Sequence, residues 1–322
     1  MSGEFELIAR HFTRPVRRAA LGVGDDCALL VPTPGMQLAV SGDMLVEGRH
    51  FLSTVAPERL GHKALAVNLS DLAACGAEPL GYLLALALPR ADESFVAPFA
   101  RGLHALADAY GIELVGGDTT AGPLTICITV FGQVAPGRAL LRSGAERGDD
   151  LWVSGTLGDA RLALEVLRGR VALAGEDFET VRRAMELPLP RVALGMALCG
   201  LASSAIDLSD GLVGDLGHVL KSSGVGAEVD LDALPRSAVL AAQPAALQQL
   251  CLLAGGDDYE LLFTAPPARA DAVLAAAAAA GVAVTRCGRI VAGKGLCIVD
   301  SSGRELPLRF GGFDHFGDTG HG

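Results

Sequence analysis

Paired cysteines and aromatic residues are scarce in this sequence. Its seven cysteines lie far apart, mostly in apolar runs, and none belongs to a Cys-x-x-Cys pair, which argues against a disulfide scaffold. Such cysteines are typical of reduced, buried thiols and indicate a cytoplasmic protein. With one Trp and three Tyr among 322 residues, the core must be filled by Ala, Leu and Val.

Positive charge is also in short supply. The chain has 26 Lys and Arg residues against 37 Asp and Glu residues, a formal net charge of −11. A surface of this sign does not attract nucleic acid or an anionic membrane over a broad area, so neither is expected as a partner. If the ligand carries phosphate, something other than net charge must bind it.

Long apolar runs are missing. The longest uncharged Ala-rich stretch, residues 272–284, has 13 residues, whereas a membrane-spanning helix needs about 20. The first 20 residues include Glu4, Glu6, Arg10 and Arg14, where a secretory signal would have an apolar segment. The sequence therefore predicts a soluble protein.

The common phosphate-binding and nucleophile motifs are absent as well. No GxxxxGK[ST] loop occurs, and residues 22–27 (GVGDDC) lack the last glycine of GxGxxG and place two acids where a diphosphate needs bare backbone N–H groups. The sequences HRD, DFG, GxSxG and HExxH do not occur either. A nucleotide site must therefore be of another type.

Short apolar segments alternate with longer Ala- and Leu-rich segments of helical periodicity, which is typical of an α/β or α+β fold. Residues 136–150 are rich in Gly, Arg and Asp and lack periodicity, so we place a domain boundary there. This predicts an N-terminal domain at residues 1–137 and a C-terminal α/β domain at residues 138–322. Strands are expected at residues 38–40, 81–88, 112–115, 124–134, 151–153 and 227–231, and helices at 92–110, 158–167, 178–185 and 211–221.

Aspartates recur in places where a carboxylate is costly. Asp71 lies on a predicted helix, and the residues around it on every face of that helix are apolar. A helix that is apolar on every face is buried. A buried ionised carboxylate costs several kcal/mol unless it is paired or bound to a cation, and no basic residue lies one turn away. Other aspartates follow strands or occupy turns with Gly or Ser: Asp25, Asp26, Asp43, Asp118, Asp207, Asp210, Asp257 and Asp258.

Oxygen ligands on separate turns, without Cys or His at metal-ligand spacing, select a hard cation such as Mg²⁺ over Zn²⁺. Because Mg²⁺ usually bridges protein carboxylates to substrate phosphates, an acidic site can bind an anion through the metal. This interpretation reconciles a phosphate ligand with the negative net charge.

Each of these residues also has an ordinary structural interpretation. Asp25 and Asp210, taken alone, are more typical of turn or helix caps, and His50 is compatible with a surface imidazole. Arg142, in the interdomain stretch, fits a solvated charge and a phosphate clamp equally well. Asp71 has no such local explanation, so a functional role is favoured there.

Several blocks, in their order along the chain, resemble the thiamine-monophosphate kinase family. They are GEFELIARHF, GVGDDCALL, DMLVEGRHF, HKALAVNLSDLAACGAEP, GIELVGGDTTAGP, GRALLRSGA, AIDLSDGL, GGDDYELLFT and GGFDHF. The resemblance implies the two-domain fold shared with aminoimidazole ribonucleotide synthetase and selenophosphate synthetase, with an N-terminal mixed-sheet domain that pairs in a homodimer. It further implies Mg²⁺-assisted transfer of the γ-phosphoryl group of ATP onto thiamine monophosphate, the last step of thiamine diphosphate synthesis.

Matched motif by motif, the resemblance implies three groups of site residues. The metal ligands would be Asp26, Ser41, the Gly42 position, Asp43, Asp71, Asp118, Asp207 and Asp210. The nucleotide contacts would be Tyr110, Gly117, Asp118, Arg142 and Ser209. The thiamine phosphate would lie against His50, Asp257 and Phe313.

Three positions depart from the family pattern. Gly42 stands where Thr is usual, so a metal contact there must use the main-chain oxygen. Asp257 stands where Glu is common and is one methylene shorter, which points to a water bridge to the substrate. Phe313 replaces Tyr or Trp, so stacking on the thiamine rings persists without a hydroxyl contact.

Phosphoryl transfer depends on positioning and charge neutralisation more than on covalent chemistry by the protein. We therefore expect in-line attack by a phosphate oxygen of thiamine monophosphate, with Asp43, Asp71 and Asp118 holding two or more Mg²⁺ ions and Arg142 steadying the triphosphate. A phosphate monoester has a second pKa of about 6 and is largely deprotonated at neutral pH. No general base is then required, and His50 becomes a positioning group.

Two alternatives stay open at this point. Another ATP-using synthetase of the same superfamily, such as a selenophosphate synthetase, usually needs a reactive cysteine or selenocysteine in a glycine-rich N-terminal segment, whereas Cys27 begins an apolar strand. A ribonucleotide synthetase would lack the GGDDYELLFT and GGFDHF blocks. A non-catalytic acidic cation-binding protein would be expected to carry its ligands in one contiguous loop, and D-x-[DN]-x-[DN]-G is absent.

Overall fold

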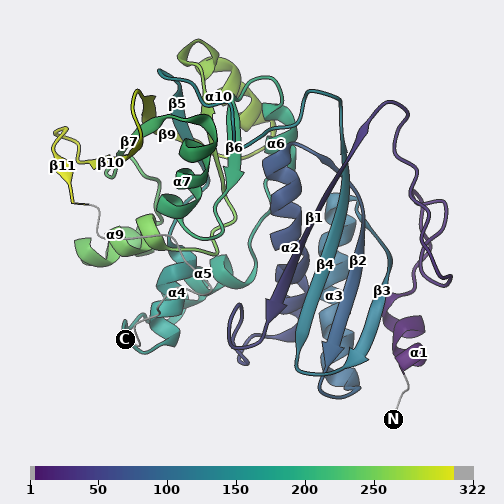
Figure 1. The fold of residues 1–322 in the computed structure, drawn as a ribbon. Helices are drawn as coiled ribbons and strands as arrows, with labels where there is room; N and C mark the ends of the chain where they lie inside the picture. The colour runs from purple at the N-terminus through teal and green to yellow at the C-terminus, as the bar shows by residue number, and fades with distance from the viewer. Residues whose placement is uncertain (1–3, 308–322) are drawn as a thin grey trace. The chain divides into compact units, whose positions relative to one another are not determined.

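The computed structural model describes residues 4–307. The chain divides into two compact units, residues 1–72 with 77–139 and residues 73–76 with 140–322. The first unit holds a four-stranded sheet and the second a seven-stranded sheet, each with helices (Figure 1). The predicted α/β (α+β) class is confirmed. Among the described helices, none combines the length and the apolar character that a membrane span requires.

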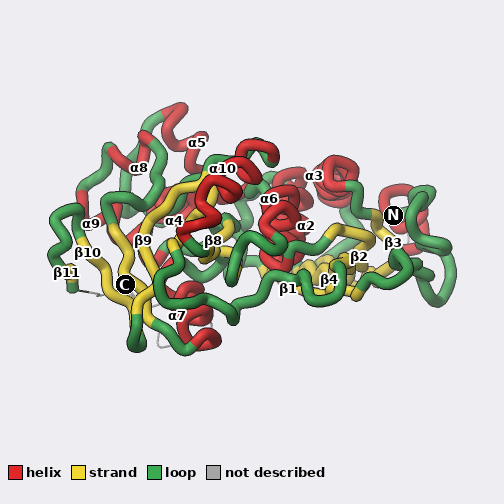
Figure 2. Tube along the Cα trace, turned by 90° about the horizontal axis from the view of Figure 1, so that it is seen from above, coloured by secondary structure: helices red, strands yellow, loops and turns green. Residues whose placement is uncertain are grey.

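The first unit is a mixed sheet with strand order β1-β4-β2-β3, in which only β2 and β3 run parallel. Helices α2 and α3 lie on one of its faces (Figure 2). The elements are α1 (Glu4–Leu7), the π-helix η1 (Ile8–Phe12), β1 (Gln37–Val46), α2 (Pro57–Cys75), β2 (Glu78–Leu88), α3 (Glu93–Tyr110), β3 (Glu113–Ala121) and β4 (Thr125–Val134).

Two glycines allow α2 and α3 to pack backbone against backbone. A Cβ atom on Gly61 would overlap the carbonyl oxygen of Phe99, and one on Gly102 would overlap that of Glu58. Glycine alone permits so close an approach at these two positions. The helices therefore cover the sheet as a tight pair, and the middle of α2, residues 63–70, is buried.

The two faces of this sheet differ sharply. The face toward the helices is built from apolar side chains that are almost fully buried, such as Ile128 and Leu86, each 1% exposed. On the opposite face the side chains of Leu38, Val40 and Met44 are 48%, 56% and 55% exposed. Within the described part of this unit, an apolar sheet surface is thus left open to solvent.

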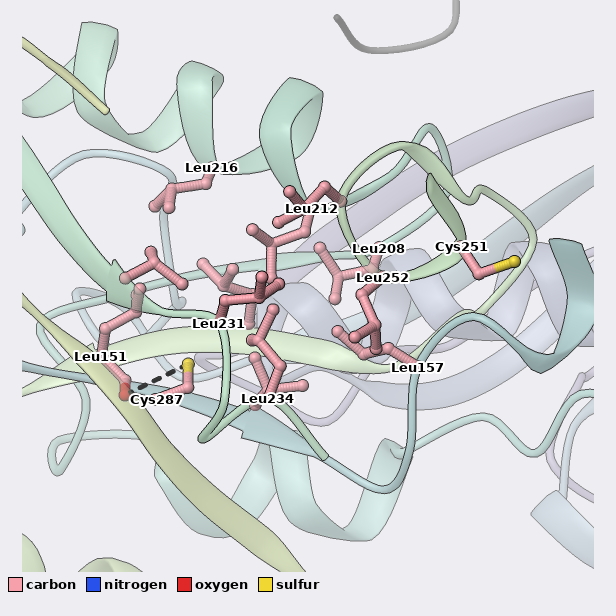
Figure 3. Packing of buried hydrophobic residues seen from close by; sticks show 14 of the residues in the cluster. Leu151, Leu157, Leu208, Leu212, Leu216, Leu231, Leu234, Cys251, Leu252 and Cys287 are labelled. Carbon is pink, nitrogen blue, oxygen red and sulfur yellow. Dashed lines mark hydrogen bonds between the residues drawn. The ribbon is translucent and has the colours of Figure 1, made fainter. Parts of the chain in front are cut away.

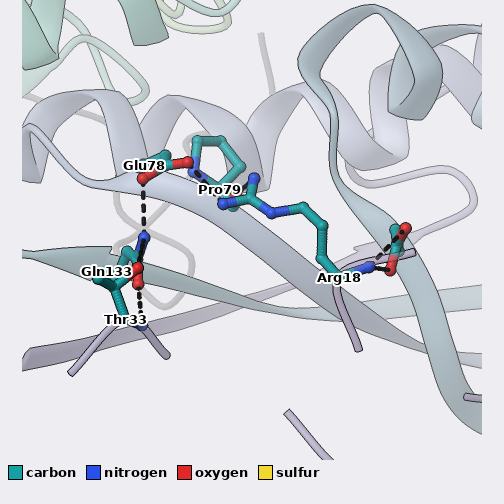
Figure 4. Close-up of polar contacts among 6 residues, drawn as sticks. Arg18, Thr33, Glu78, Pro79 and Gln133 are labelled. Carbon is teal, nitrogen blue, oxygen red and sulfur yellow. Dashed lines mark hydrogen bonds and ion pairs between the residues drawn. The ribbon is translucent and has the colours of Figure 1, made fainter. Parts of the chain in front are cut away.

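Polar contacts tie the irregular segment of residues 13–36 to the sheet (Figure 4). The Arg18 guanidinium donates to the Pro79 carbonyl at 2.8 Å. The Gln133 amide donates to Glu78 at 2.8 Å and accepts from the Thr33 N–H at 2.8 Å. The bond from Gln133, with a smaller contribution from Arg18, holds the pKa of Glu78 below its usual value.

The second unit has strand order β11-β10-β7-β9-β5-β8-β6, and only β7 and β10 run parallel. Its elements are β5 (Asp150–Ser154), α4 (Asp159–Leu167), α5 (Gly175–Glu186), α6 (Val192–Leu198), β6 (Ser204–Asp207), α7 (Leu212–Ser223), β7 (Gly226–Asp230), α8 (Ala238–Ala241), α9 (Ala245–Ala254), β8 (Leu261–Ala265), the 3₁₀ turn η2 (Pro267–Arg269), α10 (Ala270–Ala279), β9 (Val284–Val291), β10 (Gly295–Val299) and β11 (Glu305–Leu306).

Leucines from many of these elements form the core of the second unit (Figure 3). Leu151 from β5 and Leu216 from α7 are fully buried. The Cys287 thiol donates to the Leu151 carbonyl at 3.6 Å, and burial raises the pKa of Cys287 to about 12. All seven cysteines are free, but only Cys251 and Cys287 are buried; four are half-buried and Cys27 is exposed, so the expectation of buried thiols holds only in part.

Two strands are longer than predicted. Strand β1 covers Gln37–Val46 rather than residues 38–40, and β3 covers Glu113–Ala121 rather than residues 112–115. Asp43 and Asp118 therefore lie inside strands and not at their ends. The reason is that β4 and β2 supply partners along the full length of β1 and β3, and such ladder pairing overrides the low strand propensity of Gly, Asp and Ser.

Candidate functional site

Three predicted metal ligands meet where β1 passes α2. Ser41 and Asp43 alternate onto the face of β1 that looks toward the helices, and Asp71 lies three residues after Asn68 on α2. The Ser41 hydroxyl donates to Asp71 Oδ2 at 2.5 Å. The backbone N–H of Asp43 donates to Asn68 Oδ1 at 2.9 Å. The structure thus brings Ser41, Asp43 and Asp71 together.

Asn68 is the residue of this cluster whose role sequence reasoning missed. It is 1% exposed, and its amide nitrogen donates to the Ala64 carbonyl one turn earlier at 2.9 Å. That bond turns the amide oxygen toward the Asp43 backbone. The available signal was a neutral polar residue one turn before Asp71 in an otherwise apolar helix.

Asp118 lies elsewhere on the same sheet. Across the sheet, Asp118 is in one row with Ala85, Cys127 and Met44. Residues in one row point to the same side, and Met44 is on the open face, so Asp118 belongs to the face away from the helices. Asp43 instead belongs to the row that ends at Gly117. Three strand spacings separate β1 from β3, about 14 Å at ~4.8 Å each. Within one chain, Asp118 is therefore on the other edge and the other face from Asp43.

At Gly117 and Gly42 there is a steric reason for glycine, because a Cβ atom would come too close to a neighbouring strand. Gly117 has a φ of 147°, and a Cβ atom there would overlap the Leu84 carbonyl oxygen, so the backbone before Asp118 presses against β2. Gly42 alternates onto the open face, between Ser41 and Asp43, where a Cβ atom would lie 3.2 Å from the Ile128 oxygen. Neither position accepts a side chain without adjustment.

His50 is fixed in the turn that follows β1. The His50 Nδ1 accepts from the Val46 backbone N–H at 3.0 Å, and the His50 backbone N–H donates to the Val46 carbonyl at 3.0 Å. An imidazole nitrogen that accepts must be unprotonated. His50 is half-buried.

Asp26 and Tyr110 occupy more open positions. Asp26 is exposed in the segment before β1, and its backbone N–H donates to the Asp25 carboxylate at 2.8 Å. Asp25 thus acts as the turn cap that its sequence context suggested. Tyr110 is half-buried at the end of α3, before Gly111 in the left-handed conformation.

In the second unit, Asp207 ends β6, and Ser209 and Asp210 lie on the turn between β6 and α7. The turn is organised by Asp215, which is 3% exposed and whose Oδ2 accepts from the N–H groups of Ser209, Asp210 and Gly211 at 3.1, 3.0 and 3.1 Å. Burial raises the pKa of Asp215 to about 7, against the lowering effect of these three donors. Sequence reasoning missed Asp215, because its partners are backbone groups.

Asp257 lies on the loop that leads into β8. Its φ is 69° and that of Tyr259 is 51°, so two residues with side chains adopt the left-handed region that favours glycine. The Tyr259 hydroxyl donates to Asp257 Oδ1 at 3.0 Å. The neighbouring Asp258 accepts from the Gly158 N–H at 2.9 Å, and burial raises its pKa well above the usual range.

A buried ion pair anchors the same loop. Glu260 is 6% exposed and makes two bonds to the Arg191 guanidinium, one of them 2.7 Å long. The Ser154 hydroxyl donates to Glu260 at 2.5 Å and accepts from the Leu261 N–H at 2.8 Å. Arg191 and Glu260 are far apart in sequence, and no motif signalled their pairing.

The two loops of this unit are joined to each other. The Asp257 N–H donates to the Ser209 carbonyl at 2.9 Å, and the Tyr259 N–H donates to the Leu208 carbonyl at 2.8 Å. Asp207 itself pairs with Leu261 across β6 and β8. The predicted nucleotide and metal residues of this unit are therefore physically continuous with the predicted substrate residue.

The last two predicted residues are Arg142 and Phe313. Arg142 is exposed, and its carbonyl accepts from the Ser223 hydroxyl at 3.4 Å. Phe313 lies outside the described residues.

Donor chemistry decides which ion would suit the first cluster. Across residues 4–307, no three His, Cys, Asp or Glu side chains gather closely enough to hold a metal ion by themselves. Ser41, Asp43 and Asp71 nevertheless offer hydroxyl and carboxylate oxygens, which hard cations prefer. Mg²⁺ usually binds through one or two protein carboxylates and completes its shell with water and substrate phosphate. The cluster therefore fits Mg²⁺ in kind.

Comparison with known proteins defines the class of this chain. Residues 24–134 match the N-terminal domain of AIR synthase related proteins, and residues 146–300 match the C-terminal domain. Both sheets thus belong to the AIR synthase-related architecture that the sequence blocks implied.

Relatives that match nearly the full length of the chain identify the family within this class. The thiamine-monophosphate kinase of Salmonella typhimurium is 46% identical over 321 residues, 98% of either chain. The crystal structure of the thiamine-monophosphate kinase of Stenotrophomonas maltophilia K279a matches with a TM-score of 0.84 and 44% identity, over 93% of this chain and 95% of that one. The chain belongs to the thiamine-monophosphate kinase family, and the predicted family and enzyme class are confirmed.

Proposed function

We propose that this protein transfers the γ-phosphoryl group of ATP to thiamine monophosphate and so forms thiamine diphosphate and ADP. The observation that carries this proposal is the similarity to AaThiL, whose structure is complexed with AMPPCP and TMP. That structure is 31% identical, with a TM-score of 0.77, over 89% of each chain. The seven free cysteines suit a reducing compartment, and we place the enzyme in the cytoplasm.

The reaction needs two anions to be held against each other. A phosphate oxygen of thiamine monophosphate attacks the γ-phosphorus and forms the new P–O bond, while the bond from that phosphorus to the β,γ-bridging oxygen breaks and ADP leaves with the electron pair. The attacking phosphate is already deprotonated at neutral pH. The protein is therefore asked for alignment and charge compensation rather than for a base.

The Ser41, Asp43 and Asp71 cluster is the place in the first unit where we put the cation, with Asp26, the Gly42 carbonyl and Asp118 as further ligands. When bound, Mg²⁺ would screen the repulsion between the two phosphorylated substrates. Asn68 holds the Asp43 backbone and Ser41 holds the Asp71 carboxylate. The carboxylates are thereby oriented before any ligand arrives.

The nucleotide is assigned to Tyr110, Gly117, Asp118, Arg142 and Ser209, with Asp207 and Asp210 as further metal ligands. The exposed Arg142 guanidinium supports a contact with the triphosphate, because arginine matches phosphate oxygens with two parallel N–H donors. Thiamine monophosphate is assigned to His50, Asp257 and Phe313. His50 is assigned a positioning role, and its Nδ1 accepts from the Val46 backbone N–H.

We also propose a homodimer formed through the open face of the four-stranded sheet. Leu38, Val40 and Met44 place a half-exposed apolar stripe there, and such patches mark association surfaces. Asp118 lies on the same face, so a second copy seated there would lie against it.

The deciding experiment incubates the protein with ATP, Mg²⁺ and thiamine monophosphate and follows ADP and thiamine diphosphate together. Unphosphorylated thiamine serves as a parallel acceptor. We expect one ADP per thiamine diphosphate and little turnover with thiamine. ATP consumption without thiamine diphosphate would favour another synthetase of the superfamily, and a thermal shift with Mg²⁺ alone, unchanged by nucleotide, would favour a cation-binding protein.

A further inference from the structure

Asp215 of α7 is a buried carboxylate that serves three consecutive backbone N–H groups. Its Oδ2 receives the N–H groups of Ser209, Asp210 and Gly211 at 3.0–3.1 Å, while its own N–H continues the helix by donating to the Gly211 carbonyl at 3.0 Å. A helix cap of the usual kind lies before the helix and accepts from within it. Here the acceptor lies inside the helix and reaches back to the residues that precede it.

Three donors that converge on one oxygen restrict three successive peptide planes at once. Buried N–H donors left without a partner are costly, and the Asp215 carboxyl satisfies three of them. The turn also has little freedom on its other side, because a Cβ atom on Gly211, whose φ is 104°, would meet the backbone of Ala254 and Gly255. Asp215 is thus the group that selects one conformation of residues 209–211.

The restriction passes on to the loop of residues 255–260. The Ser209 peptide is held on both sides, since its N–H donates to Asp215 and its carbonyl accepts from the Asp257 N–H at 2.9 Å. A Cβ atom on Gly256 would also overlap the Ser209 carbonyl. Ser209, a predicted nucleotide residue, contacts Asp215 directly. Asp257, a predicted substrate residue, is linked to Asp215 through its hydrogen bond to Ser209.

We infer that Asp215 is a positioning residue for nucleotide binding, which holds the turn of residues 207–211 in the shape that the triphosphate and its cation require. This inference rests on the proposed function. Asp215 has no need to touch the ligand itself, because its Oδ2 acts on the backbone of the turn. Removing the Asp215 carboxylate should weaken the binding of the nucleotide more than the binding of thiamine monophosphate.

The test compares Asp215→Asn with Glu186→Gln. Both acids are 3% exposed, and Glu186 pairs with Arg182 on α5 at 2.9 Å. Calorimetric titration with AMPPCP and Mg²⁺ should give a dissociation constant about tenfold higher for Asp215→Asn, and about the wild-type value for Glu186→Gln. The constant for thiamine monophosphate should change less. Equal losses in both variants, or unchanged AMPPCP binding by Asp215→Asn, would overturn the inference.

Amide hydrogen exchange of the ligand-free wild-type protein tests the same point without a substitution. The N–H groups of Ser209, Asp210 and Gly211 should be as protected as those of neighbouring strands, and exchange at loop rates would contradict the inference. AMPPCP titration separates this question from the proposed function. If the wild-type binds AMPPCP but does not phosphorylate thiamine monophosphate, the proposed acceptor is wrong and Asp215 is still tested.

Discussion

The two units prepare their candidate residues in different ways. In the second unit, buried side chains hold the backbone of both loops: Asp215 binds the turn at residues 209–211, and Glu260 with Arg191 fixes the entry to β8. In the first unit, the acidic residues lie along strands, and Asp43 and Asp118 occupy opposite faces of one sheet. The arrangement in the second unit is complete within one chain. In the first unit, the candidate ligands must still be brought together by a cation, a substrate or another copy.

The largest expected effect tests the anchoring of the second unit. Arg191→Leu leaves the Glu260 carboxylate buried without its partner, which should lower the free energy of unfolding by about 3–5 kcal/mol. Arg14→Leu is the control, because its pair with Asp108 is 44% and 62% exposed and should contribute only ~0–1 kcal/mol. Urea unfolding of both variants checks the difference, and similar losses would show that the second unit is not specially anchored.

The next effect concerns catalysis in the first unit. Asp71→Asn removes a charge from the cluster with Ser41 and should lower kcat/KM by about 100-fold at saturating Mg²⁺, with little change in unfolding. Asp177→Asn, an exposed position on α5, controls for the loss of one negative charge. Steady-state kinetics with varied Mg²⁺ give the readout, and near-normal turnover by Asp71→Asn would remove this residue from the metal site.

A third effect is on assembly. Val40→Glu places a charge in the apolar stripe of the open sheet face and should raise the dimer dissociation constant by about 100-fold. Leu189→Glu is matched in exposure, 57% against 56%, but lies in the second unit and should leave assembly unchanged. Sedimentation velocity over a concentration series measures both, and a dimer unaffected by Val40→Glu must use another surface.

The smallest expected effect is a pH dependence of the folding stability, caused by His104 in the first unit. Burial lowers the pKa of His104 from 6.5, against the raising effect of its bond to the His11 carbonyl at 2.8 Å. The unfolded chain then binds the proton more readily, so stability is full above about pH 6.5 and falls as the pH drops toward the lowered value. His104→Gln should flatten this fall in urea midpoints between pH 7 and pH 5, and an unchanged slope would assign it to other groups.

Sequence patterns predicted the features that depend on local signals. Helical periodicity placed α3 and α4 to within a residue or two, and the apolar surroundings of Asp71 pointed to the cluster that the structure shows. The assignment of ligands came from resemblance to a family, and it stays a prediction for the residues that the structure does not bring together. Asp118 shows the limit, because the pairing order β1-β4-β2-β3 that separates it from Asp43 is a property of the whole sheet.

What could not be predicted depends on partners distant in sequence or on backbone groups. Arg191 immediately precedes α6 and Glu260 immediately precedes β8, and neither local sequence names the other as its partner. Asp215 accepts from N–H groups that every residue possesses, so its side chain has no distinctive partner in the sequence. Helix α9 was not predicted, although Ala, Leu and Gln are strong helix formers and a proline at the start is typical of a helix N-terminus.

Position 257 shows what backbone conformation costs the molecule. A residue with a Cβ atom at a φ of 69° is disfavoured by about 1 kcal/mol relative to glycine. A stability screen would therefore tend to recover Asp257→Gly, and the recovered protein would have exchanged the acceptor of the Tyr259 hydroxyl for an easier loop.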